Sequence, residues 1–169
     1  NGQLEKSGAY KKGRRHGPWK YFYEDGQLSQ KGTYKDGRQD GLWEFYDNSE
    51  RLCQKGIFND GAPDGPWETY YDNGQLQRKV MKKAGKEDGL CEIYLENGQL
   101  NSKGTQKDGK KEGQWFFYNH RNGQLKSKAT FKDNKPDGPW EFYYENGQLE
   151  SKKTYKDGNR KPCGTELYY

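Results

Sequence analysis

The chain is built on a repeat of 24 residues, and this feature constrains its fold more than any other. The tetrad Asn-Gly-Gln-Leu, or a variant of it, recurs along the chain, and the intervals between its leucines are 24, 24, 24, 24, 25 and 24 residues. A second series, of tryptophans with one cysteine, runs in step. Such regularity predicts an array of like units that stack on their neighbours. The leucines are Leu4, Leu28, Leu52, Leu76, Leu100, Leu125 and Leu149, and the second series is Trp19, Trp43, Trp67, Cys91, Trp115 and Trp140.

The spacing predicts a single repeat domain over residues 1–169, divided into units. A partial first unit covers residues 1–16 and a partial last unit covers residues 162–169. Between them lie six units, at about 17–40, 41–64, 65–88, 89–112, 113–137 and 138–161. The one-residue excess falls in residues 119–122, where we expect a turn.

Each unit contains two short runs of aromatic or β-branched residues, separated by Asn-Gly or Asp-Gly. This dipeptide favours a type I′ hairpin turn, because that turn needs positive φ at both central residues. A turn at residues 25–26 places Tyr23 opposite Leu28 and Trp19 opposite Gly32. A large ring opposite a residue without a side chain can lie flat over the neighbouring backbone, and we expect the rings to cover the strand glycines in this way.

Alternation along the strands gives the sheet two different faces. We call the face that carries the tryptophans the aromatic face. The other, the second face, carries a row of tyrosines and predicted cross-strand ion pairs, each contributing a few tenths of a kcal/mol. These pairs are Glu44–Lys55, Glu68–Lys79, Glu92–Lys103 and Glu141–Lys152.

The units are joined by a Lys-Asp-Gly-x-x-Asp-Gly link, as in residues 35–41. A loop of two or of four residues fits this link, and both keep the alternation in phase, so the choice stays open. The sequence therefore predicts an all-β fold, an elongated single-layer antiparallel meander of about fourteen short strands.

The composition agrees with an open sheet and excludes several fold classes. Leu, Ile, Val and Phe total 21 of 169 residues, a fraction typical of disordered chains, but Trp, Tyr and Phe total 26. No apolar run approaches the length of a membrane span, and aliphatic residues are too few for a helical bundle or a doubly wound α/β domain. The net charge of +5 is spread over a mixed surface, which argues against a nucleic-acid partner.

The units resemble MORN repeats, specifically the bacterial variant found in YwqK-family antitoxin-like proteins. Leucine-rich repeats share the period but need several leucines per unit. The resemblance implies curved sheets of hairpins that bind protein partners, sometimes bind membranes and sometimes dimerise. It also implies that some members are encoded beside toxins. The residues that carry it are Gly65-Pro66-Trp67, Tyr70-Tyr71, Asn73-Gly74-Gln75-Leu76 and Lys35-Asp36-Gly37.

No arrangement of residues indicates catalysis, a cofactor or a metal. His16 and His120 fall in expected turns, and neither has a second ligand at metal-binding spacing. Cys53 is expected on the second face and Cys91 on the aromatic face, so we expect free thiols. The hypothesis is therefore that the chain is not an enzyme.

The first functional hypothesis is a protein-binding scaffold, with an antitoxin or immunity role as one candidate and a toxin as one candidate partner. A partner segment would lie in a groove on the aromatic face. The alternative reading is that the rings only cover glycines and one another. The middle unit departs from the pattern, through drift or as a specific pocket. The predicted binding residues are Trp19, Tyr21, Tyr23, Trp43, Phe45, Trp67, Tyr71, Ile93, Trp115, Phe117, Trp140 and Phe142.

The second hypothesis is binding to an anionic membrane or cell-surface polymer, through basic loops at residues 11–15, 82–86 and 110–111. Pairing through a terminal strand could also give a homodimer. The localisation stays open between a bacterial cytoplasm and, if a signal segment has been removed, a cell envelope. The alternative surface for this hypothesis is the row Tyr46, Tyr70, Tyr94, Tyr118 and Tyr143.

Overall fold

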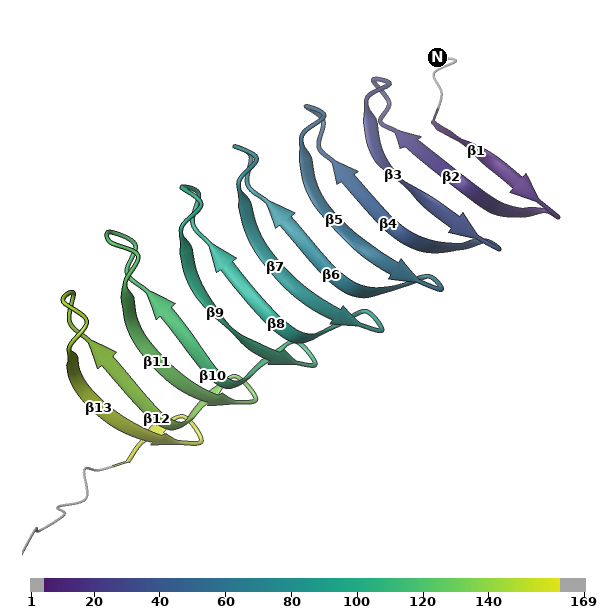
Figure 1. The fold of residues 1–169 in the computed structure, drawn as a ribbon. Helices are drawn as coiled ribbons and strands as arrows, with labels where there is room; N and C mark the ends of the chain where they lie inside the picture. Colours follow the sequence, from purple (N-terminus) through teal and green to yellow (C-terminus); the bar gives the residue numbers. More distant parts are fainter. Residues whose placement is uncertain (1–4, 162–169) are drawn as a thin grey trace, which may run out of the picture.

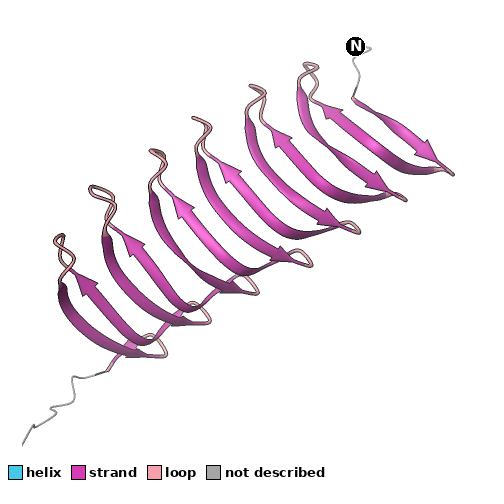
Figure 2. Cartoon of the chain, in the orientation of Figure 1, coloured by secondary structure: helices cyan, strands magenta, loops and turns pink. Residues whose placement is uncertain are grey.

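A computed structural model describes residues 5–161, which form one open antiparallel sheet (Figures 1 and 2). Its fourteen strands follow one another in sequence order, so every pairing joins neighbours in the chain. The predicted all-β single-layer meander is confirmed. Over residues 5–161 there is no helix that could cross a membrane. The first tetrad (residues 1–4), Cys163 and the partial last unit lie outside the described residues.

Successive strands run in opposite directions across the sheet. The hairpin turns lie along one long side of the sheet, called the hairpin edge, and the links lie along the other, called the link edge (Figure 1). Thirteen steps of about 4.8 Å give a sheet about 62 Å long. The strands are β1 (Lys6–Lys11), β2 (Arg14–Phe22), β3 (Leu28–Lys35), β4 (Arg38–Tyr46), β5 (Leu52–Asn59), β6 (Ala62–Tyr70), β7 (Leu76–Lys83), β8 (Lys86–Tyr94), β9 (Leu100–Lys107), β10 (Lys110–Tyr118), β11 (Leu125–Lys132), β12 (Lys135–Tyr143), β13 (Leu149–Lys156) and β14 (Asn159–Arg160).

The hairpin turns are not the predicted type I′ turns. In the first one, the N–H of Gly26 donates to the carbonyl of Tyr23 over 2.9 Å, and the N–H of Tyr23 donates to the carbonyl of Gln27 over 2.8 Å. Gly26 has φ 89°, whereas Asp25 has no positive φ. This is a type I turn followed by a glycine bulge. It forms because the Asp25 carboxylate accepts the N–H of Gln27 at 3.0 Å, which holds the turn from its side chain.

The bulge changes the register at one end of each hairpin. Trp19 pairs with Gly32 as predicted, but Leu28 pairs with Phe22 instead of Tyr23. Because residues directly opposite each other share a face, Leu28 lies on the second face and not beside the tryptophans. The predicted pairings of Trp43, Cys91 and Trp115 with their following strands, by contrast, all occur; their partners are Gly56, Gly104 and Ala129.

The type I′ turns occur instead in the links between units. Strand β3 ends at Lys35 and β4 begins at Arg38, so the link is a two-residue loop. Its central residues, Asp36 and Gly37, have φ 50° and 90°. The N–H of Gly37 donates to the carbonyl of Arg15 over 2.9 Å, and the equivalent bond recurs at later links. Each link is therefore bonded to the unit before it.

The core is a line of tryptophan rings, four of which lie on a strand glycine of the preceding unit, while Trp140 is opposite Ala129. A Cβ placed on Gly32 would lie 2.2 Å from Cδ2 of Trp43. The Trp43 indole N–H donates to the carbonyl of Thr33 over 3.1 Å, and Trp43 is completely buried. The same arrangement joins Trp19 to Gly8 and Trp115 to Gly104. Glycine is required at these positions because the ring occupies the space of a side chain.

The line of rings is interrupted once, in the middle of the array. Val80 takes the position of the strand glycine, and Cys91, its partner in register, takes the position of the tryptophan. Both are buried. The exchange divides the core into one cluster from Trp19 to Trp67 and a second around Trp115.

Candidate functional site

The tryptophans predicted to bind a partner form the floor of the aromatic face. Trp43 and Trp115 are 0% exposed, and Trp19 and Trp67 are 3% and 9% exposed. Edge-to-face contacts with neighbouring rings cover them, as where Tyr34 lies 5.1 Å from Trp43. Only Trp140, near the C-terminal end, is half-buried. These rings stabilise the sheet and offer little surface to a partner.

A row of half-buried side chains runs beside this floor. Phe45 packs between Trp43 and Trp67, with ring centroids 6.4 and 5.9 Å apart. Phe117 makes the corresponding contact with Trp115 at 6.4 Å. The same position is Thr69 in β6, so this position tolerates a small side chain. The row consists of Tyr21, Phe45, Thr69, Ile93, Phe117 and Phe142.

Tyr23 and Tyr71, also predicted for the aromatic face, lie at the hairpin edge of the sheet. The Tyr23 hydroxyl donates to the carbonyl of Tyr46 over 2.5 Å, and that of Tyr71 donates to the carbonyl of Tyr94 over 2.8 Å. Each bond crosses to the next unit. These two side chains therefore join units at their turns.

Basic side chains lie over the rings of the aromatic face, a feature that the sequence reasoning missed. The guanidinium of Arg15 lies 5.3 Å from the Trp19 ring and 5.1 Å from the Tyr34 ring. The ammonium of Lys82 lies 4.3 Å from the Trp67 ring, and that of Lys111 lies 4.6 Å from the Trp115 ring. All are cation–π distances. The only signal in the sequence is that Lys82 stands where four of the other five complete units have Tyr or Phe.

A half-buried polar cluster fills the interruption between the two aromatic clusters. Arg78 forms a bidentate ion pair with Glu87, through Nη1 to Oε1 and through Nη2 to Oε2 at 2.7 Å. The Nη2 atom also donates to Oε1 of Gln106, which is 8% exposed, at 3.2 Å. The departure of the middle unit thus consists of an ion pair and an amide on the floor beside Cys91.

Ionisation in these clusters follows from burial and from the bonds just described. The hydrogen bond from Arg78 holds the pKa of Glu87 below its usual value. Burial lowers the pKa of Lys111 and raises that of Cys91. Burial, with a hydrogen bond to Tyr34, raises the pKa of Tyr21 to about 12. Burial therefore makes the charged form of Lys111 costly in solvation.

The second face carries ladders in which each glutamate lies between two lysines. Glu68 contacts Lys55 at 3.1 Å and the predicted Lys79 at 3.5 Å. The predicted Glu141–Lys152 pair forms at 2.8 Å. The predicted partners of Glu44 and Glu92 are opposite them in register, but no ion pair joins them within residues 5–161. Glu44 bonds instead to Lys31, at 2.7 Å, because a lysine is equally close on the preceding strand.

The tyrosine row of the second face is bonded into these ladders. The hydroxyls of Tyr46, Tyr70, Tyr94 and Tyr143 donate to the glutamate two residues earlier, at 2.5 to 3.2 Å. Tyr118 follows Phe116 instead of a glutamate. All five rings are half-buried. The polar groups of this predicted alternative surface are thus largely satisfied by their own neighbours.

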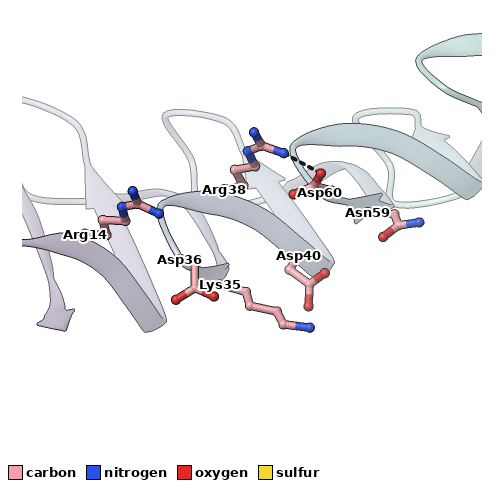
Figure 3. Close-up of a pocket in the computed structure, with 7 residues that line it drawn as sticks. All are labelled: Arg14, Lys35, Asp36, Arg38, Asp40, Asn59 and Asp60. Atoms are coloured by element: carbon pink, nitrogen blue, oxygen red, sulfur yellow. Dashed lines mark hydrogen bonds and ion pairs between the residues drawn. The ribbon is translucent and has the colours of Figure 1, made fainter. Parts of the chain in front are cut away.

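The link edge holds an open polar depression of about 290 Å³, shown in Figure 3. Arg38 makes an ion pair with Asp60 of the next link, and Lys86 and Lys110 pair in the same way with Asp108 and Asp133, each at 3.0 Å. These pairs connect successive links. The depression is lined by Arg14, Lys35, Asp36, Arg38, Asp40, Asn59 and Asp60.

The cysteines and acidic residues show no metal-binding arrangement in the part of the chain that the structure describes. Cys91 is buried and Cys53 half-buried, and both thiols are free. The Cys53 thiol donates to the carbonyl of Phe45 at 3.2 Å. Both cysteines therefore pack as small apolar residues.

Comparison with known families agrees with this architecture. A sequence profile described as the MORN repeat variant matches residues 15–36, 63–81, 87–108, 111–133 and 136–157, well over half of the chain. The unmatched stretch includes the unit whose hairpin turn reads Ser49-Glu50. No characterised protein gives a significant match. MORN repeats in general bind proteins or membranes and are not enzymes. The chain therefore belongs to the MORN repeat variant family.

Proposed function

We propose that this protein is a non-catalytic scaffold that binds a segment of a protein partner on its aromatic face. The observation that supports this is the row of half-buried rings beside a tryptophan floor, with no second layer over it in residues 5–161. A sheet of this length and about 20 Å wide offers about 1,200 Å² per face. A standard interface needs about 800 Å² per partner, with aromatic side chains as its usual anchors.

The aromatic face is favoured over the second face by the state of its charged groups. On the second face, lysines, glutamates and tyrosine hydroxyls bond to one another. A partner would have to break these bonds or match them. On the aromatic face, the rings beside the floor and the cations above it remain available.

The biological role that we propose is that of an antitoxin or immunity protein, with a toxin as the partner. This part of the proposal rests on the resemblance of the units to YwqK-family proteins. Co-expression with the product of the adjacent gene tests it. We expect the product of the adjacent gene to be toxic when expressed alone and harmless when expressed with this chain. If that product is not toxic, the antitoxin or immunity role is contradicted.

The binding face is tested with ring substitutions that the array itself tolerates. Phe45→Thr with Phe117→Thr places at both positions the residue that the array already has at Thr69. The matched control, Tyr46→Thr with Tyr118→Thr, removes two rings from the second face. Each variant is used as bait in an affinity pull-down with mass spectrometry, after circular dichroism has checked folding.

We expect the aromatic-face variant to lose the partners that the unsubstituted chain captures, while the control keeps them. Loss in the control with retention in the aromatic-face variant would place the interface on the second face. Equal capture by both variants would contradict binding through either row of rings.

A second candidate function is binding to an anionic membrane or surface polymer through the link edge. The observation that favours it is the run of basic side chains at successive links, such as Lys83, Lys107 and Lys132, which are exposed. Sedimentation with anionic vesicles tests it. Binding that disappears at high salt and is unaffected by Phe45→Thr with Phe117→Thr would support this function.

A further inference from the structure

The two faces of the sheet differ in how their positive charges are compensated. Most lysines of the second-face ladders lie in ion pairs, as Lys31, Lys55 and Lys152 do, at 2.7 to 3.1 Å, although Lys103 lies over the Phe116 ring without one. On the aromatic face, four cations lie over rings, and no carboxylate of residues 5–161 is within ion-pair distance of them. They are Arg15, Lys82, Lys111 and Lys153.

Two of these cations flank the interruption in the middle of the face. Lys82 is opposite Glu87 in register, and Lys111 is opposite Gln106. Lys82 is on β7 and Lys111 is on β10, three strands away, which corresponds to about 14 Å. The carboxylate between them, on Glu87, is already bound bidentately by Arg78. The middle of the aromatic face therefore has three cations and one carboxylate.

The ammonium of Lys111 is surrounded by aromatic rings and lacks a carboxylate counter-charge among residues 5–161. Its ammonium lies 4.6, 5.2 and 5.1 Å from the rings of Trp115, Phe117 and Phe131. Burial lowers the pKa of this group, because the rings replace part of its water without supplying a full counter-charge. A carboxylate brought to it from outside would make a charge-assisted hydrogen bond in a partly desolvated place, where such bonds are strong.

We propose that the partner segment bound by the aromatic face is an extended acidic peptide, with one carboxylate against Lys82 and another against Lys111. This inference rests on the proposed function and names the chemistry of its partner. A strand-like peptide that crosses the sheet advances about 3.4 Å per residue, so the two acidic residues are about four positions apart. Their apolar neighbours lie on the row that contains Phe117.

The test is a selection of random linear peptides on the full chain, followed by affinity measurements of the selected peptides by fluorescence anisotropy. The decisive variant is Lys82→Gln with Lys111→Gln. It is compatible with the fold, because Gln106 and Gln39 occupy the equivalent positions in other units. The matched control is Lys79→Gln with Lys103→Gln, which removes the same charge from neighbouring positions on the second face.

We expect the selected peptides to be rich in Asp and Glu, with pairs about four residues apart. Their affinity should fall about tenfold or more in the Lys82 and Lys111 variant and change little in the control. The affinity should also weaken as salt is raised, since the contacts are between charges.

Three outcomes would overturn the inference, and they separate it from the proposed function. The selected peptides could be neutral, and could lose affinity for the Phe45 and Phe117 variant but not for the Lys82 and Lys111 variant. That result would support the aromatic face as the binding face and contradict its preference for acidic peptides. Peptides insensitive to both variants, or a selection without binders, would contradict both proposals. Anionic vesicles bound through Lys82 and Lys111, without any acidic peptide, would replace the peptide by a lipid surface.

Discussion

At the scale of single residues, the array depends on the fit between a tryptophan ring and the glycine beneath it in the preceding unit. The rings of Trp19, Trp43 and Trp115 occupy the space of a side chain on Gly8, Gly32 and Gly104. In the middle of the array, Val80 and Cys91 together fill the space that a glycine and a tryptophan fill in other units. The two arrangements should therefore be exchangeable only as complete pairs.

Copying the Val80–Cys91 pair into another unit tests this exchange. We expect Gly32→Val alone to destabilise the protein by about 3 kcal/mol, because the new side chain meets the Trp43 ring. Trp43→Cys alone should cost about 3–5 kcal/mol, because it leaves a cavity. The double variant should cost less than the sum by at least about 1 kcal/mol. Urea unfolding followed by circular dichroism measures all three.

The control for this cycle combines Gly32→Val with Trp115→Cys, two sites that share no contact. Its costs should add. If the Gly32 and Trp43 substitutions also add, the ring and the glycine are not coupled, and this description of the core is wrong.

Much of this residue-scale arrangement could be predicted from the repeat. Alternation and spacing place Trp19 opposite Gly32 and Trp43 opposite Gly56, as the structure has them. They could not show that the ring covers the glycine of the preceding strand, since both neighbouring strands have glycine at that level. Nor could they identify Lys82 as part of the site, because a single lysine in place of an aromatic residue looks the same as drift.

At the scale of the structural elements, two kinds of turn alternate along the chain. Links such as Asp36-Gly37 have positive φ at both positions, and hairpin turns such as residues 23–26 have it only at the last. The sequence favours a type I′ turn in the hairpins because Asn-Gly or Asp-Gly stands there, although Asp-Gly also occurs in the links. What separates them is the side-chain bond of Asp25 to the backbone, which an Asp-Gly pair alone does not reveal.

One hairpin turn carries a residue that is poorly suited to its conformation. Glu50 takes the place of the bulge glycine and has φ 56°. A non-glycine residue in this left-handed conformation costs about 1–2 kcal/mol of stability. Glycine avoids this cost, but it loses more conformational entropy on folding, which offsets part of the gain. We expect Glu50→Gly to stabilise the protein by about 0.5–1 kcal/mol, measured as a shift in the urea midpoint.

The reverse change gives the matched control for this turn. Gly74→Glu, at the same position of the next hairpin turn, should destabilise by about 1 kcal/mol. Destabilisation by Glu50→Gly would mean that the Glu50 side chain has a role that its exposed position does not show.

At the scale of the whole molecule, acidic and basic side chains are concentrated in different parts of the sheet. The hairpin turns are mainly acidic, as at Glu24 and Glu96, and the links are mainly basic, as at Lys83 and Lys107. On the second face most ladder lysines are paired with a glutamate, whereas the cations that lie over rings on the aromatic face have no carboxylate partner among residues 5–161. A partner rich in carboxylates is therefore attracted to one face of the sheet and not to the other.

The ladders of the second face make stability depend on acid pH. Burial opposes the shift, but hydrogen bonds from Tyr70 and Lys55 hold the pKa of Glu68 below its usual 4.5, and bonds from Lys152 and Tyr143 lower that of Glu141 to about 2. A carboxyl whose pKa is lower in the folded protein stabilises it fully above pH 4.5. That contribution is lost as pH falls toward the folded value.

We therefore expect the Tm to be nearly constant from neutral pH down to about 5 and to fall between about 4.5 and 2. Glu68→Gln with Glu141→Gln should lower the Tm at neutral pH and make its fall in acid shallower. Thermal unfolding at a series of pH values measures both effects. An unchanged acid slope in the double variant would show that these two ladders do not contribute to it.

The overall fold could be predicted from the 24-residue repeat, whereas the candidate binding site could be predicted only in part. Fourteen strands in sequence order are what a hairpin repeat of this length must give. The rings Phe45 and Phe117 were placed on the correct face, because alternation decides that. The spacing leads to the expectation that the tryptophans cover glycines, but not to the extent of their burial, since that depends on how neighbouring rings pack across strands.

The central claim is that a partner binds on the aromatic face, and lysine footprinting of the complex tests it most directly. The protein, alone and bound to a captured partner or acidic peptide, is labelled with an amine-reactive reagent and analysed by mass spectrometry. Each lysine then reports the face on which it lies. We predict that Lys82 and Lys111 become protected in the complex, while Lys79 and Lys103 react as in the free protein. Protection of Lys79 and Lys103 with unchanged labelling of Lys82 and Lys111 would contradict the claim.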